Sequence, residues 1–343
     1  MKFAFRTDAA AGTGRLKRCL ALAHALRDRG ALVTFFSRSG DAAAAAAVQA
    51  EGFAAVELGA SSAQGEVADA TAFVHAARIL RPEVVVVDHE SLGGRWERAV
   101  RGALAARLSA IDTPPERTHD VDILIAPDLL PDPAHPPAGR SNAETALLGG
   151  PRYALLGPAY ALAPRHVPQA AVYSIGICMG DADTLNLSET AYDACRVLAA
   201  FEGEIEIATA AGNPHLERLR WRTAADAGTL LSLDPPDLEA FFARHDVLIG
   251  SGGETTWERC CVGAPTLAVI AAPNQRATLL PLQQQGALEL LSDEPPTADP
   301  IARALKQLLA DAARRAALCH TAHALVDGLG AARVADRLFL LLP

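Results

Sequence analysis

The chain has 343 residues, of which half are hydrophobic and 21% are charged, and its formal net charge is −9 at pH 7. This length is enough for two domains of ordinary size, and the composition excludes an intrinsically disordered protein. The acidic charge argues against a protein whose main role is to bind nucleic acid or an anionic membrane surface, although it permits a local basic pocket.

The six cysteines indicate a reduced, cytoplasmic location. None of them forms a CxxC pair or shows metal-ligand spacing, and most lie in apolar segments where a free thiol acts as a small hydrophobe. The N-terminus reaches charged residues too early for a secretory signal, and no apolar run approaches the roughly 20 residues of a membrane span. We therefore expect a soluble protein without stable membrane insertion.

In the first half of the chain, short apolar runs alternate with longer segments of helical period, which predicts an α/β fold with a parallel sheet. The expected strands are 2–6, 31–37, 84–88, 107–112 and 122–126. The expected helices are 16–29, 41–50, 68–80 and 94–106. Residues 127–140 contain five prolines and no periodicity, so we expect a surface loop there.

A second α/β series follows the Gly- and Pro-containing stretch 157–168, which resembles an interdomain linker. Its expected strands are 171–178, 204–208, 229–233, 246–250, 266–270 and 288–291. Its expected helices are 187–200, 238–244, 256–262, 276–285, 300–309 and 331–341. The predicted domains are 1–158 and 171–343, joined by a linker at 159–170. An open alternative is that the last helix packs back on the first domain.

This organisation predicts two doubly wound Rossmann-type domains that face each other across a cleft. Open α/β sheets bind ligands beyond the carboxyl ends of their strands, where a strand turns into a helix. Two such turns stand out in the sequence.

The later turn follows the apolar run 245–249 and precedes a helix-like segment at 259–262. A strand, a glycine-rich turn and a helix start in this order expose backbone N–H groups to which an anion can bind. Glu258 is then placed to accept hydrogen bonds from a ribose. Thr255 and Glu258 also have the spacing of a capping box, and this alternative stays open with equal weight. The candidate binding residues here are Gly250, Ser251, Gly252, Gly253, Glu254, Thr255, Thr256 and Glu258.

The earlier turn follows the first strand and contains Gly12, Thr13 and Gly14, with Arg15 and Arg18 at the start of the next helix. Positive side chains at the positive end of a helix dipole are unfavourable by up to about 1 kcal/mol each, unless an anion completes the site. The alternative is that both arginines pair with Asp8 or another carboxylate and only fix the loop. We favour the ligand interpretation because both domains carry the same order of strand, glycine turn and helix start.

Motifs spread along nearly the whole chain resemble those of the UDP-sugar hydrolases of pseudaminic acid biosynthesis. They are Arg6-x-Asp8, Gly12-Thr13-Gly14, Arg18-Cys19-Leu20, Val87-Asp88-His89, Arg95-Trp96-Glu97, Ile111-Asp112, Arg117-x-His119-Asp120, Tyr153-Ala154-Leu155-Leu156, Thr255-Thr256-Trp257-Glu258-Arg259-Cys260-Cys261, Pro273-Asn274-Gln275 and Leu325-Val326-Asp327-Gly328-Leu329-Gly330. The Thr-Thr-Trp-Glu-Arg-Cys-Cys segment is the most specific of them.

The resemblance implies a GT-B-like fold, related to the GlcNAc transferase of peptidoglycan assembly, with UDP held mainly by the second domain. It implies release of UDP from a 2,4-diacetamido-2,4,6-trideoxyhexose by water attack at the anomeric carbon, without metal or cofactor, in nonulosonic acid synthesis for flagellin or surface glycans. Glu258 would bind ribose, residues 250–256 would bind the diphosphate, and Asn274 would face the reacting sugar. Gln275 is a further candidate substrate-binding residue. The resemblance also implies other enzymes of the pathway as partners. The alternative for Asn274 is a turn asparagine after Pro273.

Two positions depart from the family where the chemistry is expected. Arg15 stands where the family has histidine, and Glu90 stands where it has tyrosine. Arginine stays charged and cannot replace a histidine base. Arg15 and Glu90 are expected to form an ion pair, or Glu90 acts as the base with His89 or Asp8 beside it. The alternative for His89 is a structural hydrogen-bonding role.

Three functions therefore stay open at this stage. The first is the UDP-sugar hydrolase, with Asp8, Arg15, His89, Glu90 and Asn274 as the altered catalytic set. The second is a GT-B glycosyltransferase whose acceptor is a hydroxyl group instead of water. The third is a catalytically silent protein that binds a nucleotide sugar.

Overall fold

A computed structural model describes residues 1–8, 13–59, 65–113, 117–132, 135, 139, 141, 144–181, 183–236, 238–291 and 296–342. The chain forms two compact units. Unit 1 comprises Met1–Pro158 and Gly328–Pro343, and unit 2 comprises Ala159–Asp327. No helix in the described ranges has both the length and the apolar character needed to cross a membrane.

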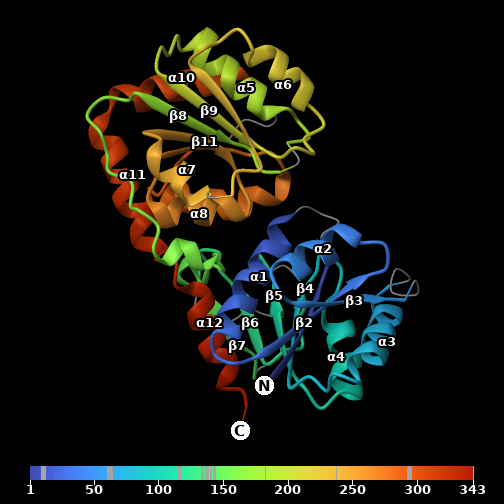
Figure 1. The fold of residues 1–343 in the computed structure, drawn as a ribbon. Coiled ribbons are helices and arrows are strands. Elements are labelled where there is room, and N and C mark those ends of the chain that lie inside the picture. Colours follow the sequence, from blue (N-terminus) through green and yellow to red (C-terminus); the bar gives the residue numbers. More distant parts are fainter. Residues whose placement is uncertain are drawn as a thin grey trace. The chain divides into compact units, whose positions relative to one another are not determined.

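Unit 1 is built on a seven-stranded parallel sheet in the order β3-β2-β1-β4-β5-β6-β7 (Figure 1). The strands are β1 (Lys2–Thr7), β2 (Leu32–Arg38), β3 (Ala54–Leu58), β4 (Val84–Asp88), β5 (Arg107–Ile111), β6 (Ile123–Ala126) and β7 (Ala146–Gly149). The helices are α1 (Thr13–Arg27), α2 (Ala42–Ala50), α3 (Glu66–Ala77), α4 (Gly94–Ala103) and α12 (Gly330–Phe339), with the 3-10 turn η2 (Pro151–Tyr153). The chain order reverses between β1 and β4, which is the topological switch point of this sheet.

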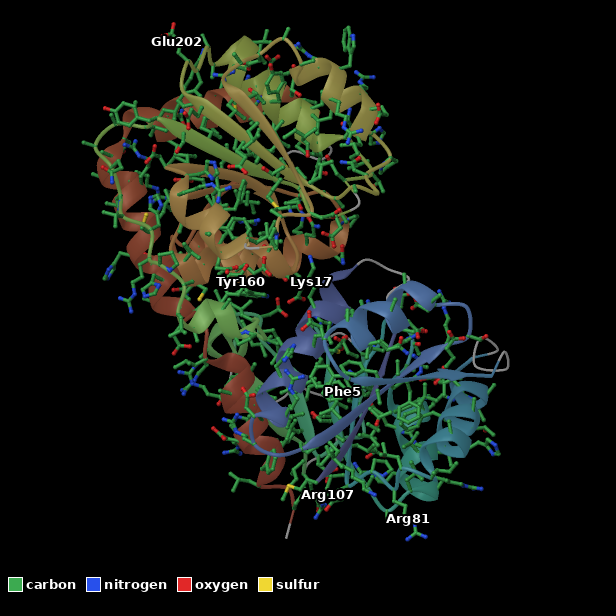
Figure 2. The ribbon with its side chains drawn as sticks, in the orientation of Figure 1. Phe5, Lys17, Arg81, Arg107, Tyr160 and Glu202 are labelled. Atoms are coloured by element: carbon green, nitrogen blue, oxygen red, sulfur yellow. The ribbon has the colours of Figure 1, made fainter. Side chains whose placement is uncertain are left out.

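Alternating side chains of the central strands supply two separate cores, one on each face of the sheet. Phe3 and Phe5 of β1 pack in a cluster with α1, α2 and α12, whereas Ala4 packs in a cluster with α3 and α4. Figure 2 shows Phe5 inside unit 1. It also shows Lys17, near the start of α1, and Arg107, at the start of β5, toward opposite ends of the unit. Helix α1 therefore begins at the carboxyl edge of the strands.

Unit 2 is built on a six-stranded parallel sheet in the order β10-β9-β8-β11-β12-β13 (Figure 1). The strands are β8 (Ser174–Cys178), β9 (Glu204–Thr209), β10 (Thr229–Leu233), β11 (Val247–Ser251), β12 (Thr266–Val269) and β13 (Glu289–Leu291). The helical segments are η3 (Pro158–Ala161), α5 (Leu187–Asp193) continued by the π-helical η4 (Ala194–Leu198), α6 (Leu216–Thr223), α7 (Leu238–Arg244), α8 (Glu254–Val262), η5 (Pro273–Gln275), α9 (Arg276–Gln284), α10 (Ala298–Ala310) and α11 (Ala312–Leu325). Its switch point lies between β8 and β11.

Several elements differ from the sequence-based expectation. Strands β3 and β7 and helices α6 and α11 were not predicted, and the helix predicted to end at residue 106 ends at Ala103. β3 and β7 are the two edge strands of their sheet, and both are short. They are fixed by pairing with a neighbouring strand more than by an apolar run of their own. Leu104 has an extended backbone because the chain must turn there to enter β5.

The segment expected to be a linker is held on unit 2. The backbone N–H of His166 donates to the carbonyl of Val262 at 2.9 Å, and Arg315 donates to the carbonyls of Gln169 and Ala170 at 2.9 Å each. The final helix α12 packs on α1 and shares its hydrophobic core. All six cysteines are free and buried, as their apolar surroundings predict.

Candidate functional site

At the switch point of unit 2, the chain leaves β11, makes a glycine turn and enters α8. The N-cap of α8 is Gly253, at φ 111° and ψ −164°, a conformation that favours glycine. The N-cap glycine makes no side-chain cap hydrogen bond, and Thr255 and Glu258 both lie inside α8. The capping-box alternative is therefore wrong, because the helix starts two residues before the position that the box requires.

Gln275 holds the glycine turn from a segment 23 residues away. Its Oε1 accepts from the N–H of Gly252 at 3.1 Å and of Ala271 at 2.9 Å, and its Nε2 donates to the carbonyl of Gly252 at 3.2 Å. A Cβ at Gly252 would lie 2.7 Å from the Cβ of Gln275, so only glycine fits this contact. The sequence places Gln275 at the substrate, whereas the structure uses its amide group to shape the turn. Asn274 is exposed beside it in η5.

The strand side of the turn is held by side chains of unit 2. Ser251 Oγ donates to the carbonyl of Met179 at 2.9 Å, which links the ends of β11 and β8. Gly250 lies against the buried guanidinium of Arg259, whose Nη1 would be 2.6 Å from a Cβ at that position. Arg259 was not among the predicted site residues. The sequence feature that could have pointed to it is a basic residue directly before the apolar run Cys260–Val262.

The N-terminus of α8 is suited to bind an anion. The first N–H groups of a helix have no intrahelical partner and carry the positive end of its dipole. Glu254 and Thr255 are half-buried in the first turn, and Thr256 is buried. Glu258 is half-buried next to the buried Tyr160, whose pKa is raised by burial and by the charge of Glu258. Tyr160 is labelled in Figure 2.

At the switch point of unit 1, Asp8 and His89 join the ends of β1 and β4. Asp8 accepts from Arg6 at 2.6 Å, from the N–H of Arg38 at 2.8 Å and from His89 Nε2 at 2.9 Å. Burial raises the pKa of Asp8, but hydrogen bonds from His89 and Arg6 outweigh burial and hold it well below its ordinary value. Asp8 is thus a permanent carboxylate that orients His89 and is unsuited to act as a base.

The tautomer of His89 follows from its partners. The backbone N–H of Ser91 donates to Nδ1 at 3.1 Å, so Nδ1 is an acceptor and the ring proton lies on Nε2, toward Asp8. Both ring nitrogens are engaged within the protein. These contacts match the structural role that was the alternative for His89.

Arg15 and Arg18 have different surroundings. Buried Arg18 grips Asp88 with two hydrogen bonds of 2.6 Å and donates to Thr113 at 2.6 Å, which is the loop-fixing alternative. Arg15 is looser: its Nε is 3.5 Å from Asp88, and its Nη2 is 3.8 Å from Glu90. The expected ion pair between Arg15 and Glu90 is therefore present. The Glu90 side chain is 64% exposed, so this pair contributes little to stability.

The rest of the earlier turn is only partly described. Gly12 and the side chain of Thr13 lie outside the described residues, and Gly14 is half-buried in the first turn of α1. A supporting cluster that was not assigned a role lies next to this edge. Arg117 pairs with Asp112 at 2.6 Å and donates to the carbonyls of His89 and Leu92, so it fixes the loop that carries Glu90.

Buried His119 completes that cluster by bonding Glu97 at 2.6 Å and Asp112 at 3.1 Å. Burial lowers the pKa of His119, but its hydrogen bonds to the two carboxylates and their charges raise it to about 9. In the described part of the chain, no group of three or more His, Cys, Asp or Glu residues is arranged to hold a metal ion.

Comparison with solved structures relates both sheets to a known architecture. MurG of Acinetobacter baumannii matches with a TM-score of 0.72 and 14% identity over 99% of both chains. The fold is GT-B-like. MnaA of S. aureus, solved with UDP, matches at 0.68 and 12% identity over 100% of this chain and 97% of its own. The spinosyn rhamnosyltransferase SpnG matches at 0.66 and 18% identity over 98% and 100%. No family model and no curated protein matches the sequence.

Proposed function

We propose that the protein is a GT-B glycosyltransferase, which moves a sugar from a nucleoside-diphosphate sugar to an acceptor hydroxyl. The observation that carries this proposal is the turn between β11 and α8, at the switch point of a parallel sheet. There the buried side chain of Arg259 lies next to the N-terminus of α8. The GT-B-like fold supports it, because one neighbour was solved with UDP and another is named a rhamnosyltransferase.

In this proposal the nucleotide binds to unit 2. The diphosphate takes the N–H groups of Gly253 and the first turn of α8, with Glu254, Thr255 and Thr256 around it. Ser251 and Gly250 shape the strand end, and Gln275 keeps the turn in place. Glu258 accepts from the ribose hydroxyls.

We assign the acceptor to the carboxyl edge of unit 1. Arg15 is charged and only loosely paired, so it is available to an anionic or polar group of the substrate. Glu90 is exposed and takes the proton of the acceptor hydroxyl as its oxygen bonds to the anomeric carbon and the nucleoside diphosphate leaves. Asp8, His89 and Arg18 hold these groups in place.

The second candidate is hydrolysis of a UDP-2,4-diacetamido-trideoxyhexose in nonulosonic acid synthesis. The observation that favours it is the order of motifs from Arg6 to Gly330, which covers nearly the whole chain. Several of these motif residues also form the contacts described above, including Asp112, Arg117 and His119. In this case water replaces the acceptor hydroxyl at Glu90.

The purified protein is to be tested with UDP- and dTDP-sugars, including UDP-diacetamido sugars, with and without glycan acceptors, while release of the nucleotide is followed by chromatography. Release that requires an acceptor supports the transferase, and release in water alone supports the hydrolase. Binding without turnover indicates a silent binding protein. A protein that binds neither UDP nor dTDP contradicts the proposed function altogether.

Variants connect each outcome with the site. Glu258→Gln is expected to weaken UDP binding by about 1–3 kcal/mol if the carboxylate holds the ribose. Glu217→Gln, an exposed change in α6 of the same unit, is the matched control and should leave binding unchanged. The double change Arg15→His and Glu90→Tyr restores the family residues and should raise hydrolysis if the hydrolase is correct; a loss of transfer activity would instead support the present pair.

A further inference from the structure

We infer that Arg259 is a positioning residue whose buried charge selects a diphosphate at the glycine turn of unit 2, and that the bound diphosphate supplies its missing counter-charge. This inference rests on the proposed nucleotide site and goes beyond it by naming the group that distinguishes a diphosphate from an uncharged nucleoside.

The guanidinium of Arg259 is buried with only neutral hydrogen-bond acceptors. The side chain is among the largest fully buried ones, with 1% of the residue exposed. Its Nη2 donates to the carbonyl of Ser251 at 2.7 Å and to Thr256 Oγ1 at 3.3 Å, and its Nη1 donates to Thr255 Oγ1 at 3.1 Å. Its Nε is buried without a hydrogen-bond partner. Among the described residues, no ion pair includes Arg259.

The charged and titratable groups near Arg259 do not neutralise it by contact. Glu258 is the carboxylate that acts on it electrostatically, yet the two side chains make no ion pair in the described structure. The other groups around it are Cys178, Cys260 and Tyr160, whose own pKa values are raised, so they are uncharged near neutral pH. A buried ion without a partner is costly, and burial accordingly lowers the pKa of Arg259.

Two other buried arginines show how this protein neutralises such a charge elsewhere. Arg6 is paired with Asp8 and Asp69, at 2.6 Å each. Arg315 donates to four carbonyls, and two of them, Leu308 and Leu309, belong to the last turn of α10, where the helix dipole is negative. Arg259 instead reaches back to the first turn of α8, where the dipole is positive. Its surroundings therefore favour an anion from outside the chain.

The hydrogen bonds of Arg259 also prepare the turn for that anion. A guanidinium only donates, so Thr255 Oγ1 accepts from it and keeps its own hydroxyl hydrogen for another acceptor. Thr255 is half-buried in the first turn of α8, next to the helix N–H groups. Gly250 allows this arrangement, because a Cβ there would clash with Nη1 of Arg259 at 2.6 Å. The N-terminus, the threonine hydroxyl and the buried cation thus act on the same ligand.

The test compares UDP, UMP and uridine on the full chain by isothermal titration calorimetry. The wild type should bind UDP far more tightly than uridine. Arg259→Gln should weaken UDP binding by about 10- to 100-fold and change uridine binding less than about twofold, because only the phosphates interact with the charge. Arg259→Lys keeps the charge and should retain most of the UDP-to-uridine ratio. Uridine binding shows that the variants are folded.

Arg315→Gln is the matched control, since it removes an equally buried guanidinium of the same unit, far along the chain from the turn. It should lower the melting temperature and leave the UDP-to-uridine ratio unchanged. An Arg259→Gln variant that binds uridine and keeps the wild-type ratio overturns the inference, and so does an Arg259→Lys variant that loses the ratio entirely. Either result leaves the proposed function standing. A wild type that binds neither UDP nor dTDP refutes the proposed function itself.

Discussion

The contact between Gly252 and Gln275 allows a quantitative test of how the glycine turn is built. In Gly252→Ala the new Cβ would lie 2.7, 2.9 and 3.0 Å from Cβ, Cγ and Cδ of Gln275. The glutamine side chain must then move, which breaks the two hydrogen bonds that its Oε1 accepts and the one that its Nε2 donates. At about 0.5–1.5 kcal/mol for each bond, Gly252→Ala should lower the free energy of unfolding by about 2–4 kcal/mol.

Gln275→Ala removes the same three hydrogen bonds and should cost a similar amount. Gln275→Ala keeps the Cβ that lies 2.7 Å from the new one, so Gly252→Ala in that background should cost only this remaining clash, about 1 kcal/mol. Because the three hydrogen bonds are lost only once, the double-mutant cycle should show a coupling energy of about 1–3 kcal/mol.

Urea unfolding followed by tryptophan fluorescence measures these energies, because Trp257 is buried in α8 directly after the turn. Gly212→Ala is the control: a Cβ added to this turn glycine of the same unit would meet no atom within 4 Å, so alanine should be tolerated there. Additive costs for Gly252→Ala and Gln275→Ala would refute the reasoning, since they would mean that the two residues do not share one contact.

Three further predictions concern unit 1. The pKa of His119 is raised to about 9 from 6.5, so the stability that its charged form adds should be complete below pH 6.5 and lost as the pH rises through about 9. Urea unfolding at several pH values in this range should show the free energy of unfolding falling with pH in the wild type and changing less in His119→Gln. Asp69→Asn removes the charge of a buried partner of Arg6 and Trp96 and should lower the free energy of unfolding by about 3 kcal/mol. Asp336→Asn, which breaks an exposed ion pair with Arg29, should lower it by less than about 1 kcal/mol, and equal losses would contradict the prediction. Gly330→Ala would place a Cβ 2.1 Å from the carbonyl oxygen of Ala154 and should lower the free energy of unfolding by about 3 kcal/mol in thermal or urea unfolding. Gly102→Ala in α4, with open space around it, is the control and should be neutral or stabilising by up to about 1 kcal/mol. Tolerance of alanine at Gly330 would show that α12 does not make this close contact.

Local sequence was enough to predict most of the fold. Apolar runs such as Val84–Asp88 and Val247–Ser251 are buried from end to end, and such runs form central strands of parallel sheets. The glycine turns after β1 and β11 could be placed at the carboxyl edges of their sheets for the same reason. Edge strands such as Ala54–Leu58 escaped prediction because their stability comes from a neighbouring strand rather than from their own apolar residues.

The roles of the polar residues were decided by tertiary structure. Sequence patterns named Asp8, Arg18, His89 and Gln275 as candidates, but each of them also has a hydrogen-bond partner 23 to 81 residues away along the chain. Hydrogen bonds depend on distances of about 3 Å, which no local pattern specifies when the partners come from different strands. The same holds for Arg259: the sequence shows a cation beside an apolar run, and only the fold shows that no carboxylate among the described residues pairs with it.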